Sequence, residues 1–236
     1  WCCLVGSEMC IRDSFQDQQL LDAAWMSLKI AFLTACMSLV MGMLASLALV
    51  RLGRFRGKMS FAGMITAPLV MPEVITGLSL LLLFVAMEKS FGWPGGRGML
   101  TIWIAHVTFS TAFVTVILSS RLKEIDRSLE EAGMDLGASP LKVFFVITIP
   151  IITPALLAAW LLAFTLSLDD IVIASFVSGP GSTTLPMKVF SSVRLGISPK
   201  INALASIIIA LVSLGVLTAG WIIRGWERKK TMGIPQ

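Results

Sequence analysis

The chain has 236 residues, of which 56% are hydrophobic and 14% are charged, and its formal net charge is +5. Soluble domains average about 45–50% apolar and about 25% charged residues, so this composition disfavours a soluble domain, a disordered chain and a nucleic-acid-binding protein. With a mean hydropathy of +0.86, the chain is expected to be an integral membrane protein.

Five apolar stretches are each long enough to cross a bilayer as a helix, which takes about 20 residues. In chain order they cover residues 30–50, 61–87, 99–119, 143–168 and 201–223. None of them alternates as a barrel strand does, so we expect an all-α integral membrane fold, a multi-helix bundle. Prolines interrupt two of the stretches: Pro68 and Pro72, with Glu73, in the second, and Pro150 and Pro154 in the fourth.

The basic residues indicate how the bundle is oriented. Three connecting segments hold 12 of the 19 Lys and Arg residues: four follow the first stretch, four lie between the third and fourth, and four follow the fifth. These segments share one side of the membrane if all five stretches cross it, and the positive-inside rule makes that side the cytoplasm. The C-terminus is therefore expected in the cytoplasm.

Residues 1–14 do not form a signal peptide, because no positive segment precedes an apolar one there. The predicted orientation also places the start of the first stretch outside the cell, with no earlier span to deliver it. We therefore expect residues 1–14 to be non-native or disordered, residues 15–230 to form the transmembrane domain with five of six spans, and residues 231–236 to be a tail.

The segment between the third and fourth stretches, residues 120–142, contains a helix–turn–helix pattern. Ser128 and Glu131 have the spacing of a capping box, which predicts a helix from Leu129. Gly137 offers a left-handed stop, and Ser139 with Pro140 offers an N-cap and a first helical residue for the next helix.

Four small or apolar residues of the first of these helices share one face, at spacings i, i+3, i+4 and i+7: Leu129, Ala132, Gly133 and Leu136. This face has room for the close approach of a partner. It could equally pack on the protein's own bundle, and the pattern alone does not decide between the two.

The same segment resembles the EAA motif of binding-protein-dependent ABC importer permeases. It reads Glu131-Ala132-Gly133, three residues, Gly137, nine residues, then Ile147-Thr148-Ile149-Pro150, with Gly133 in place of a second alanine and Ile149 in place of a leucine. The resemblance implies that this loop docks on a cytosolic ATPase subunit, and that the coupling residues are Glu131, Ala132, Gly133, Gly137, Ile147 and Pro150.

Three further segments resemble the polyamine branch of that family, the putrescine and spermidine permeases: residues 67–77, 166–170 and 176–181. The resemblance implies a bacterial inner-membrane subunit with six spans, partnered by a second homologous permease, cytosolic ATP-binding subunits and a periplasmic substrate-binding protein. It implies no enzymatic activity and no cofactor in this chain, since ATP is bound by the partner ATPase. A permease of the same class for another small solute is the alternative, and an ion-coupled secondary transporter is disfavoured because no inverted repeat is visible.

Three carboxylates lie in or at the edge of the apolar stretches: Glu73, Asp169 and Asp170. An ionised carboxylate at the bilayer centre costs about 2.5–3.5 kcal/mol, so such groups usually face a cavity or a partner. They are candidates for attracting a polycationic substrate along a pathway. Alternatively, the two aspartates could be solvated or could cap the helix that begins near Ile171.

Two aromatic residues, Trp103 and Trp160, could stack on the substrate, although an interfacial belt or core role is the more common one for tryptophan. The single histidine, His106, is expected to be packed and hydrogen-bonded. With one histidine and four cysteines that do not pair with it, neither a metal site nor a catalytic site is predicted.

Overall fold

The computed structural model describes residues 18–53 and 55–195, together with positions 209–210, 212–215, 217–218 and 221. Most of the stretch expected at 201–223 lies outside the described residues, as do residues 1–14 and the tail at 231–236. The elements of residues 18–195 are all helical, which confirms the predicted fold class. They are α2 (Gln18–Val50), α3 (Lys58–Val70), α4 (Glu73–Phe91), α5 (Met99–Glu124), α6 (Arg127–Asp135), α7 (Pro140–Val143), the π-helix η1 (Phe144–Thr148), α8 (Ile149–Asp169), α9 (Val172–Val177) and α10 (Leu185–Leu195).

The chain forms two compact units, one made of residues 23–187 and the other of residues 1–22 with residues 188–236. The second unit contributes few described contacts. One of them is a hydrogen bond of 2.9 Å from Lys188 Nζ to Gln19 Oε1. The candidate site residues all lie in the first unit.

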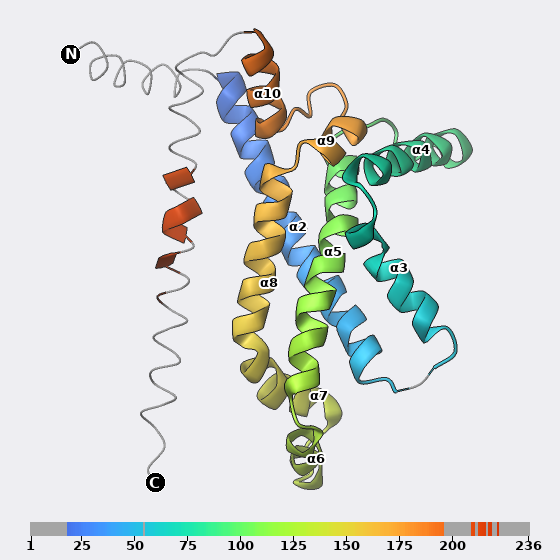
Figure 1. The fold of residues 1–236 in the computed structure, drawn as a ribbon, viewed down its shortest axis with the longest axis vertical. Helices are drawn as coiled ribbons and strands as arrows, with labels where there is room; N and C mark the ends of the chain where they lie inside the picture. The colour runs from blue at the N-terminus through green and yellow to red at the C-terminus, as the bar shows by residue number, and fades with distance from the viewer. Residues whose placement is uncertain are drawn as a thin grey trace, which may run out of the picture. The chain divides into compact units, whose positions relative to one another are not determined.

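Within residues 23–187, helices α2, α5 and α8 lie alongside one another (Figure 1). In the part of the chain that the structure describes, four helical segments are long and apolar enough to cross a membrane: α2, α4, α5 and the continuous stretch Pro140–Asp169. Half of the most apolar part of α5 is buried, against 17% for α4 and for Pro140–Asp169. Helix α5 is thus the centre of the unit, while the others expose apolar side chains, as suits helices that face lipid or further transmembrane helices.

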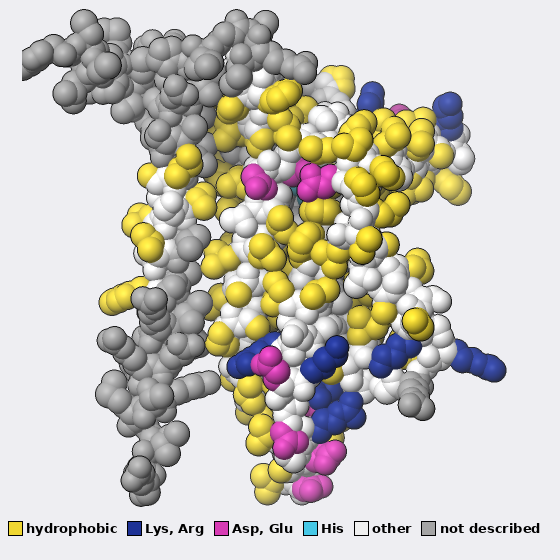
Figure 2. Space-filling model, in the orientation of Figure 1, with side chains coloured by type: hydrophobic (Ala, Val, Ile, Leu, Met, Phe, Trp, Pro, Cys, Tyr) yellow, Lys and Arg dark blue, Asp and Glu magenta, His cyan; other side chains and the backbone are white. Residues whose placement is uncertain are grey.

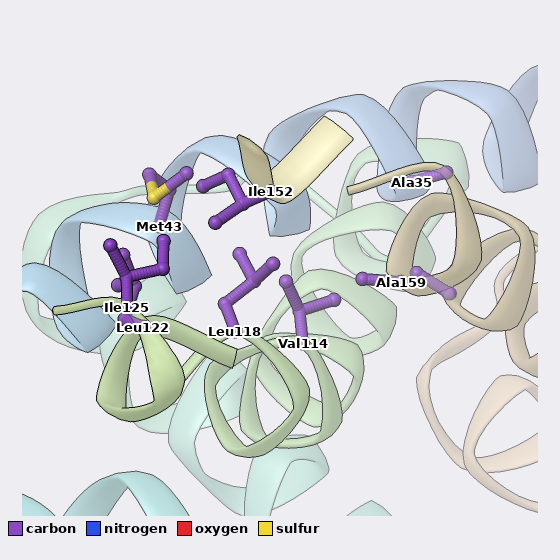
Figure 3. Close-up of a cluster of buried hydrophobic side chains, with 9 residues drawn as sticks. Ala35, Met43, Val114, Leu118, Leu122, Ile125, Ile152 and Ala159 are labelled. Atoms are coloured by element: carbon purple, nitrogen blue, oxygen red, sulfur yellow. The ribbon is translucent and has the colours of Figure 1, made fainter. Parts of the chain in front are cut away.

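A cluster of buried hydrophobic side chains joins α2, α5 and α8 (Figure 3). Met43 and Ala35 come from α2, and they meet Val114 and Leu118 from α5 and Ile152 from α8. A second cluster joins α2, α4, α5 and α9 through Ile30, Phe84, Ile102, Phe109, Ile173 and Val177 among others. The two clusters hold α5 against its neighbours along most of its length.

Small residues allow α2 and α5 to approach closely. A Cβ added at Gly42 would lie 2.5 Å from Val114 Cγ1, so only glycine fits there. Nearby, Ser38 Oγ donates to the Val107 carbonyl at 3.4 Å. Such contacts are typical of helix pairs in membranes, where small residues replace the hydrophobic effect as the basis of association.

The stretch expected at 61–87 is not one helix. Helix α3 ends at Val70, Met71 adopts an extended conformation (φ −78°, ψ 138°), and α4 begins after Pro72. Proline has no N–H and restricts the residue before it to extended backbone, which explains the break. The expected interruption at Pro72 is therefore present. The interruption expected at Pro68 is wrong, because Pro68 lies inside α3.

This break changes what the stretch can do. Helix α3 has 13 residues, which at about 1.5 Å each is about 20 Å and too short for a hydrocarbon core of about 30 Å. Helix α4 departs from α3 at a steep angle and extends sideways from beside one end of α5 (Figure 1). The stretch expected at 61–87 is thus divided between two helices, and Glu73 lies at the start of the second.

Candidate functional site

The residues expected to act lie at opposite ends of the bundle. One group belongs to the EAA segment, which we define as residues 125–150 and which contains α6, α7, η1 and the start of α8. The other group lies at the far end of α8, where α9 begins. Figure 2 shows charged side chains gathered around α6 and, at the other end of the bundle, acidic side chains near the end of α8 and near the junction of α3 and α4.

The EAA segment begins later than the expected loop of 120–142, because α5 continues as a helix to Glu124. Helix α6 then begins at Arg127, and its N-cap is Asp126, whose carboxylate accepts from the Ser128 N–H at 3.0 Å. The predicted capping box of Ser128 and Glu131 is therefore wrong: Ser128 is already inside the helix. The Ser128 backbone N–H and, to a lesser degree, its side chain hold the pKa of Asp126 below its usual value, since both bond the ionised carboxylate.

The end of α6 and the start of α7 are as the sequence predicts. Gly137 has φ +84°, the left-handed conformation that glycine adopts without strain. Ser139 is the N-cap of α7, with its hydroxyl accepting from the Lys142 N–H at 3.4 Å, and Pro140 is the first helical residue. These residues set the sharp turn between α6 and α7.

The small face of α6 is partly buried against the bundle and partly exposed. Gly133 is buried, and a Cβ placed there would lie 2.7 Å from Ile147 Cδ1 and 3.2 Å from Val143 Cγ2. In contrast, Leu129 is 49% exposed and Leu136 is 89% exposed. The glycine packs α6 on its own bundle, and the leucines remain at the surface.

The other motif residues lie on α6, on η1 and at the start of α8. Glu131 and Ala132 are exposed on α6. Ile147 belongs to η1, whose wider turn precedes Pro150 in the first turn of α8. A proline has no N–H to donate to the preceding turn, which favours a local departure from α-helical bonding at this point.

Two basic side chains tie α6 to the end of α2, a connection that the sequence did not reveal. Arg51 Nη2 lies 2.9 Å from Glu130 Oε1, and Arg127 Nη2 donates to the Val50 carbonyl at 3.0 Å. Thr148 Oγ1 in η1 also donates to Glu130 Oε1 at 3.0 Å. Partners that lie 79 and 18 residues from Glu130 share no local pattern, so no sequence signal would have found this network.

At the opposite end, Ser167, His106 and Asp170 form a buried hydrogen-bonded chain. His106 is 2% exposed; its Nδ1 lies 2.7 Å from Ser167 Oγ and its Nε2 lies 3.0 Å from Asp170 Oδ2. A carboxylate can only accept, so Nε2 carries a proton, and in the neutral ring Nδ1 accepts from the serine hydroxyl. The expected packed and hydrogen-bonded role of His106 is confirmed.

This trio has the residue types of a hydrolase triad, which the sequence did not suggest could meet. Its geometry serves a structural purpose instead. Asp170 Oδ2 accepts from the Ala174 N–H at 2.8 Å and Oδ1 from the Ile173 N–H at 3.3 Å, so the carboxylate caps α9. Ser167 is 6% exposed, which leaves its hydroxyl little access to a substrate. The trio fixes the junction of α8 and α9 against α5.

The other two carboxylates are exposed. Asp169 lies beside Asp170 at the end of α8, and within the described part of the chain its carboxylate bonds no other residue. Glu73 is exposed in the first turn of α4. Helix α4 packs on α9, where a Cβ added at Gly77 would lie 2.8 Å from Phe176 Cδ2. The structure therefore separates Asp170, which is bonded within the bundle, from Asp169 and Glu73, which are exposed.

The two candidate tryptophans also differ. Trp160 stacks on Phe164 at 5.4 Å between ring centroids, meets Phe32 edge-on at 5.8 Å, and donates from Nε1 to Cys36 Sγ at 3.5 Å. Phe164 belongs to α8 itself, and the contacts with Phe32 and Cys36 pack α8 on α2. Trp103 lies one turn before His106 on α5, and its buried Nε1 has no hydrogen-bond partner.

Comparisons with known proteins show the family of this chain. The family model described as "Binding-protein-dependent transport system inner membrane component" matches residues 29–231. The chain is 61% identical over 219 residues to the putrescine transport system permease protein PotI of Escherichia coli K12, which covers 93% of this chain and 78% of that protein. It is 40% identical over 209 residues to the spermidine/putrescine transport system permease protein PotC of Haemophilus influenzae, covering 89% of this chain and 78% of that one.

Two solved structures share the fold at low sequence identity. A chain of the MetNI methionine ABC transporter has a TM-score of 0.71 at 17% identity, covering 87% of this chain and 95% of that one. A chain of a bacterial ABC transporter that imports alginate has a TM-score of 0.73 at 17% identity, covering 92% and 82%. At this level of identity the likeness establishes the fold.

Proposed function

This chain belongs to the family of binding-protein-dependent transport system inner membrane components, and from that premise we propose that it is a permease subunit of an ATP-driven importer of polyamines. The observation that carries the substrate class is the similarity, over nearly the whole chain, to permeases named for putrescine and spermidine. Both substrates are polycations, and the exposed carboxylates of Asp169 and Glu73 have the charge to attract them.

The subunit forms half of a translocation pathway together with a second, homologous permease. ATP is bound by cytosolic subunits, one at each EAA segment, and a periplasmic binding protein delivers the substrate. The basic residues around α6 support a cytoplasmic location for the EAA segment, and the C-terminus is on the same side. The chain itself holds no cofactor and performs no chemistry.

The surface of the EAA segment suits docking on an ATP-binding subunit. Leu129, Leu136 and Leu141 are exposed, at 49%, 89% and 72% of their surface, and Glu131 is exposed on α6 as well. Exposed large apolar side chains on a short segment that also carries charged residues have the composition of a protein interface. The residues behind the patch, Gly133 and Ile147, would carry its movement into α8.

At the other end, Asp169 and Glu73 are proposed to contact the amino groups of the substrate. Asp170 supports them indirectly, by fixing the junction of α8 and α9 through His106. Trp103 stays a pathway candidate because of its unpartnered Nε1. Trp160 is occupied by contacts with α2, so its proposed contribution is to packing.

The experiment is ATP-dependent uptake of radiolabelled putrescine and spermidine by the complete transporter in proteoliposomes. We expect Glu73→Gln, Asp169→Asn and the double variant to lower uptake while the complex assembles normally. Glu88→Gln is the matched control, because Glu88 is also exposed on α4 but lies near its other end. Wild-type uptake in both single variants and in the double variant would refute the carboxylate site, and uptake of neither polyamine by the wild type would refute the substrate class.

A further inference from the structure

The ion pair between Arg51 and Glu130 joins α6 to the end of α2, and neither residue is part of the EAA pattern. The two side chains are 16% and 19% exposed and their nearest atoms are 2.9 Å apart. Arg127, at the start of α6, adds a second link by donating to the Val50 carbonyl. Helix α6 is therefore attached to α2 at two points.

Glu130 also holds α6 to the start of α8. Its Oε1 accepts from Thr148 Oγ1 at 3.0 Å, and Thr148 is 2% exposed within η1. One carboxylate oxygen thus receives both the arginine of α2 and the hydroxyl of η1. A displacement of α6 must move both elements with it or break these bonds.

The ion pair matters for α6 because this helix has little apolar contact with the bundle. Of its nine residues only Gly133 is buried, and the side chains that glycine meets belong to α7 and η1. Charge-assisted hydrogen bonds are stronger than neutral ones, and more so when partly shielded from water. The bonds of Arg51 and Arg127 are consequently the main described connections from α6 to α2.

Helix α2 is in turn joined to the rest of the bundle. Gly42 lies against Val114 of α5, and Cys36 accepts from Trp160 of α8. A force applied to α6 can therefore reach the middle of the bundle by two routes, through η1 into α8 and through Arg51 into α2.

We propose that Arg51 and Glu130 are positioning residues that transmit the displacement of α6 to α2 during ATP-driven transport. This inference rests on the proposed function, since it assigns a role within the same importer. It differs from a purely stabilising role in one measurable respect: loss of the pair uncouples transport from ATP hydrolysis in complexes that are fully assembled.

The test uses the complete transporter in proteoliposomes, with putrescine uptake and phosphate release measured on the same preparation. Glu130→Arg and Arg51→Glu are each expected to lower the putrescine carried per ATP at least about fivefold, the lower end of typical coupling between two sites. The double exchange restores the pair with reversed charges, and an arginine at 130 can still bond the Thr148 hydroxyl, so the ratio is expected to recover.

The matched control is the exchange of Arg121 and Glu124, which are paired in the last turn of α5 and are 45% and 59% exposed. Exposed pairs contribute little, so this exchange leaves the ratio unchanged. The amount of assembled complex is measured for every variant. A purely stabilising role would change the amount of assembled complex, but it would leave the putrescine carried per ATP by each assembled complex unchanged.

The inference is overturned if the single variants keep the wild-type ratio, or if they lose only assembled complex. If the double exchange does not restore the putrescine carried per ATP, Glu130→Gln is the deciding variant, because glutamine keeps the hydrogen bonds and removes the charge. A wild-type ratio in Glu130→Gln overturns the inference, and a lowered ratio supports it. Failure of the proposed substrate would appear in the wild type itself, as no ATP-dependent putrescine uptake.

Discussion

Replacement of Asp170 by alanine should destabilise the junction of α8 and α9, although its neighbour Asp169 can be replaced without this effect. The Asp170 carboxylate accepts from His106 Nε2 at 3.0 Å and from the N–H groups of Ile173 and Ala174. His106 is 2% exposed, so its ring has no water to replace the lost partner.

The magnitude follows from these contacts. Loss of a helix cap costs about 1 kcal/mol, and a buried donor left without an acceptor costs about 1–3 kcal/mol. Together they give a loss of about 2–4 kcal/mol in the free energy of unfolding. For a chain of this length, each kcal/mol shifts the midpoint of thermal unfolding by about 2–4 °C, so Asp170→Ala should lower it by about 4–16 °C.

The assay is the thermal midpoint of the detergent-solubilised complex, followed by the fraction that stays dispersed after heating. Asp169→Ala is the matched control; because its side chain is exposed, it should stay within about 0.5 kcal/mol of wild type. His106→Ala should cost less in the Asp170→Ala background than alone, since the two residues share one hydrogen bond. Equal midpoints for the two aspartate variants would show that the cap and the histidine bond do not hold this junction.

Two further predictions concern the EAA segment. Gly133→Ala should be tolerated, because Ile147 Cδ1 is the end of a side chain that can turn away. Gly133→Leu should cost about 1–3 kcal/mol in the free energy of unfolding by overpacking and should displace α6. Protease sensitivity of the EAA segment measures the displacement, and equal sensitivity of the two variants would contradict the prediction. Gly137→Val places a branched residue at φ +84° and should cost at least about 1 kcal/mol in the free energy of unfolding. Gly137→Val and Glu131→Ala, each made alone, should uncouple phosphate release from uptake. Coupled transport in both variants would contradict the docking role of this surface.

Several features of this protein followed directly from local sequence. Gly137, Ser139 and Pro140 were assigned their backbone roles correctly because each role depends on the residue's own stereochemistry and its nearest neighbours. The break at Pro72 has the same origin. The cap of α6 was misassigned by two residues because Asp126 and Ser128 both offer suitable oxygens, and the position of the preceding helix end decided which one was used.

The functional surfaces depended on contacts between distant parts of the chain. Sequence placed Glu73, Asp169 and Asp170 in one group, but only the structure shows that Asp170 is bonded within the bundle while the other two are exposed. His106 lies 61 and 64 residues from its two partners, so no spacing rule connects them.

By itself the sequence determined that this is a helical membrane protein and where its EAA motif lies. Partitioning of apolar side chains into lipid and local backbone conformation depend on each residue and its nearest neighbours in the chain. The tertiary structure decided which face of α6 is buried, in which direction α4 runs after the break at Pro72, and that Arg51 meets Glu130. Those outcomes depend on which helices pack together, and packing is set by shape and charge across the whole bundle rather than along any one segment.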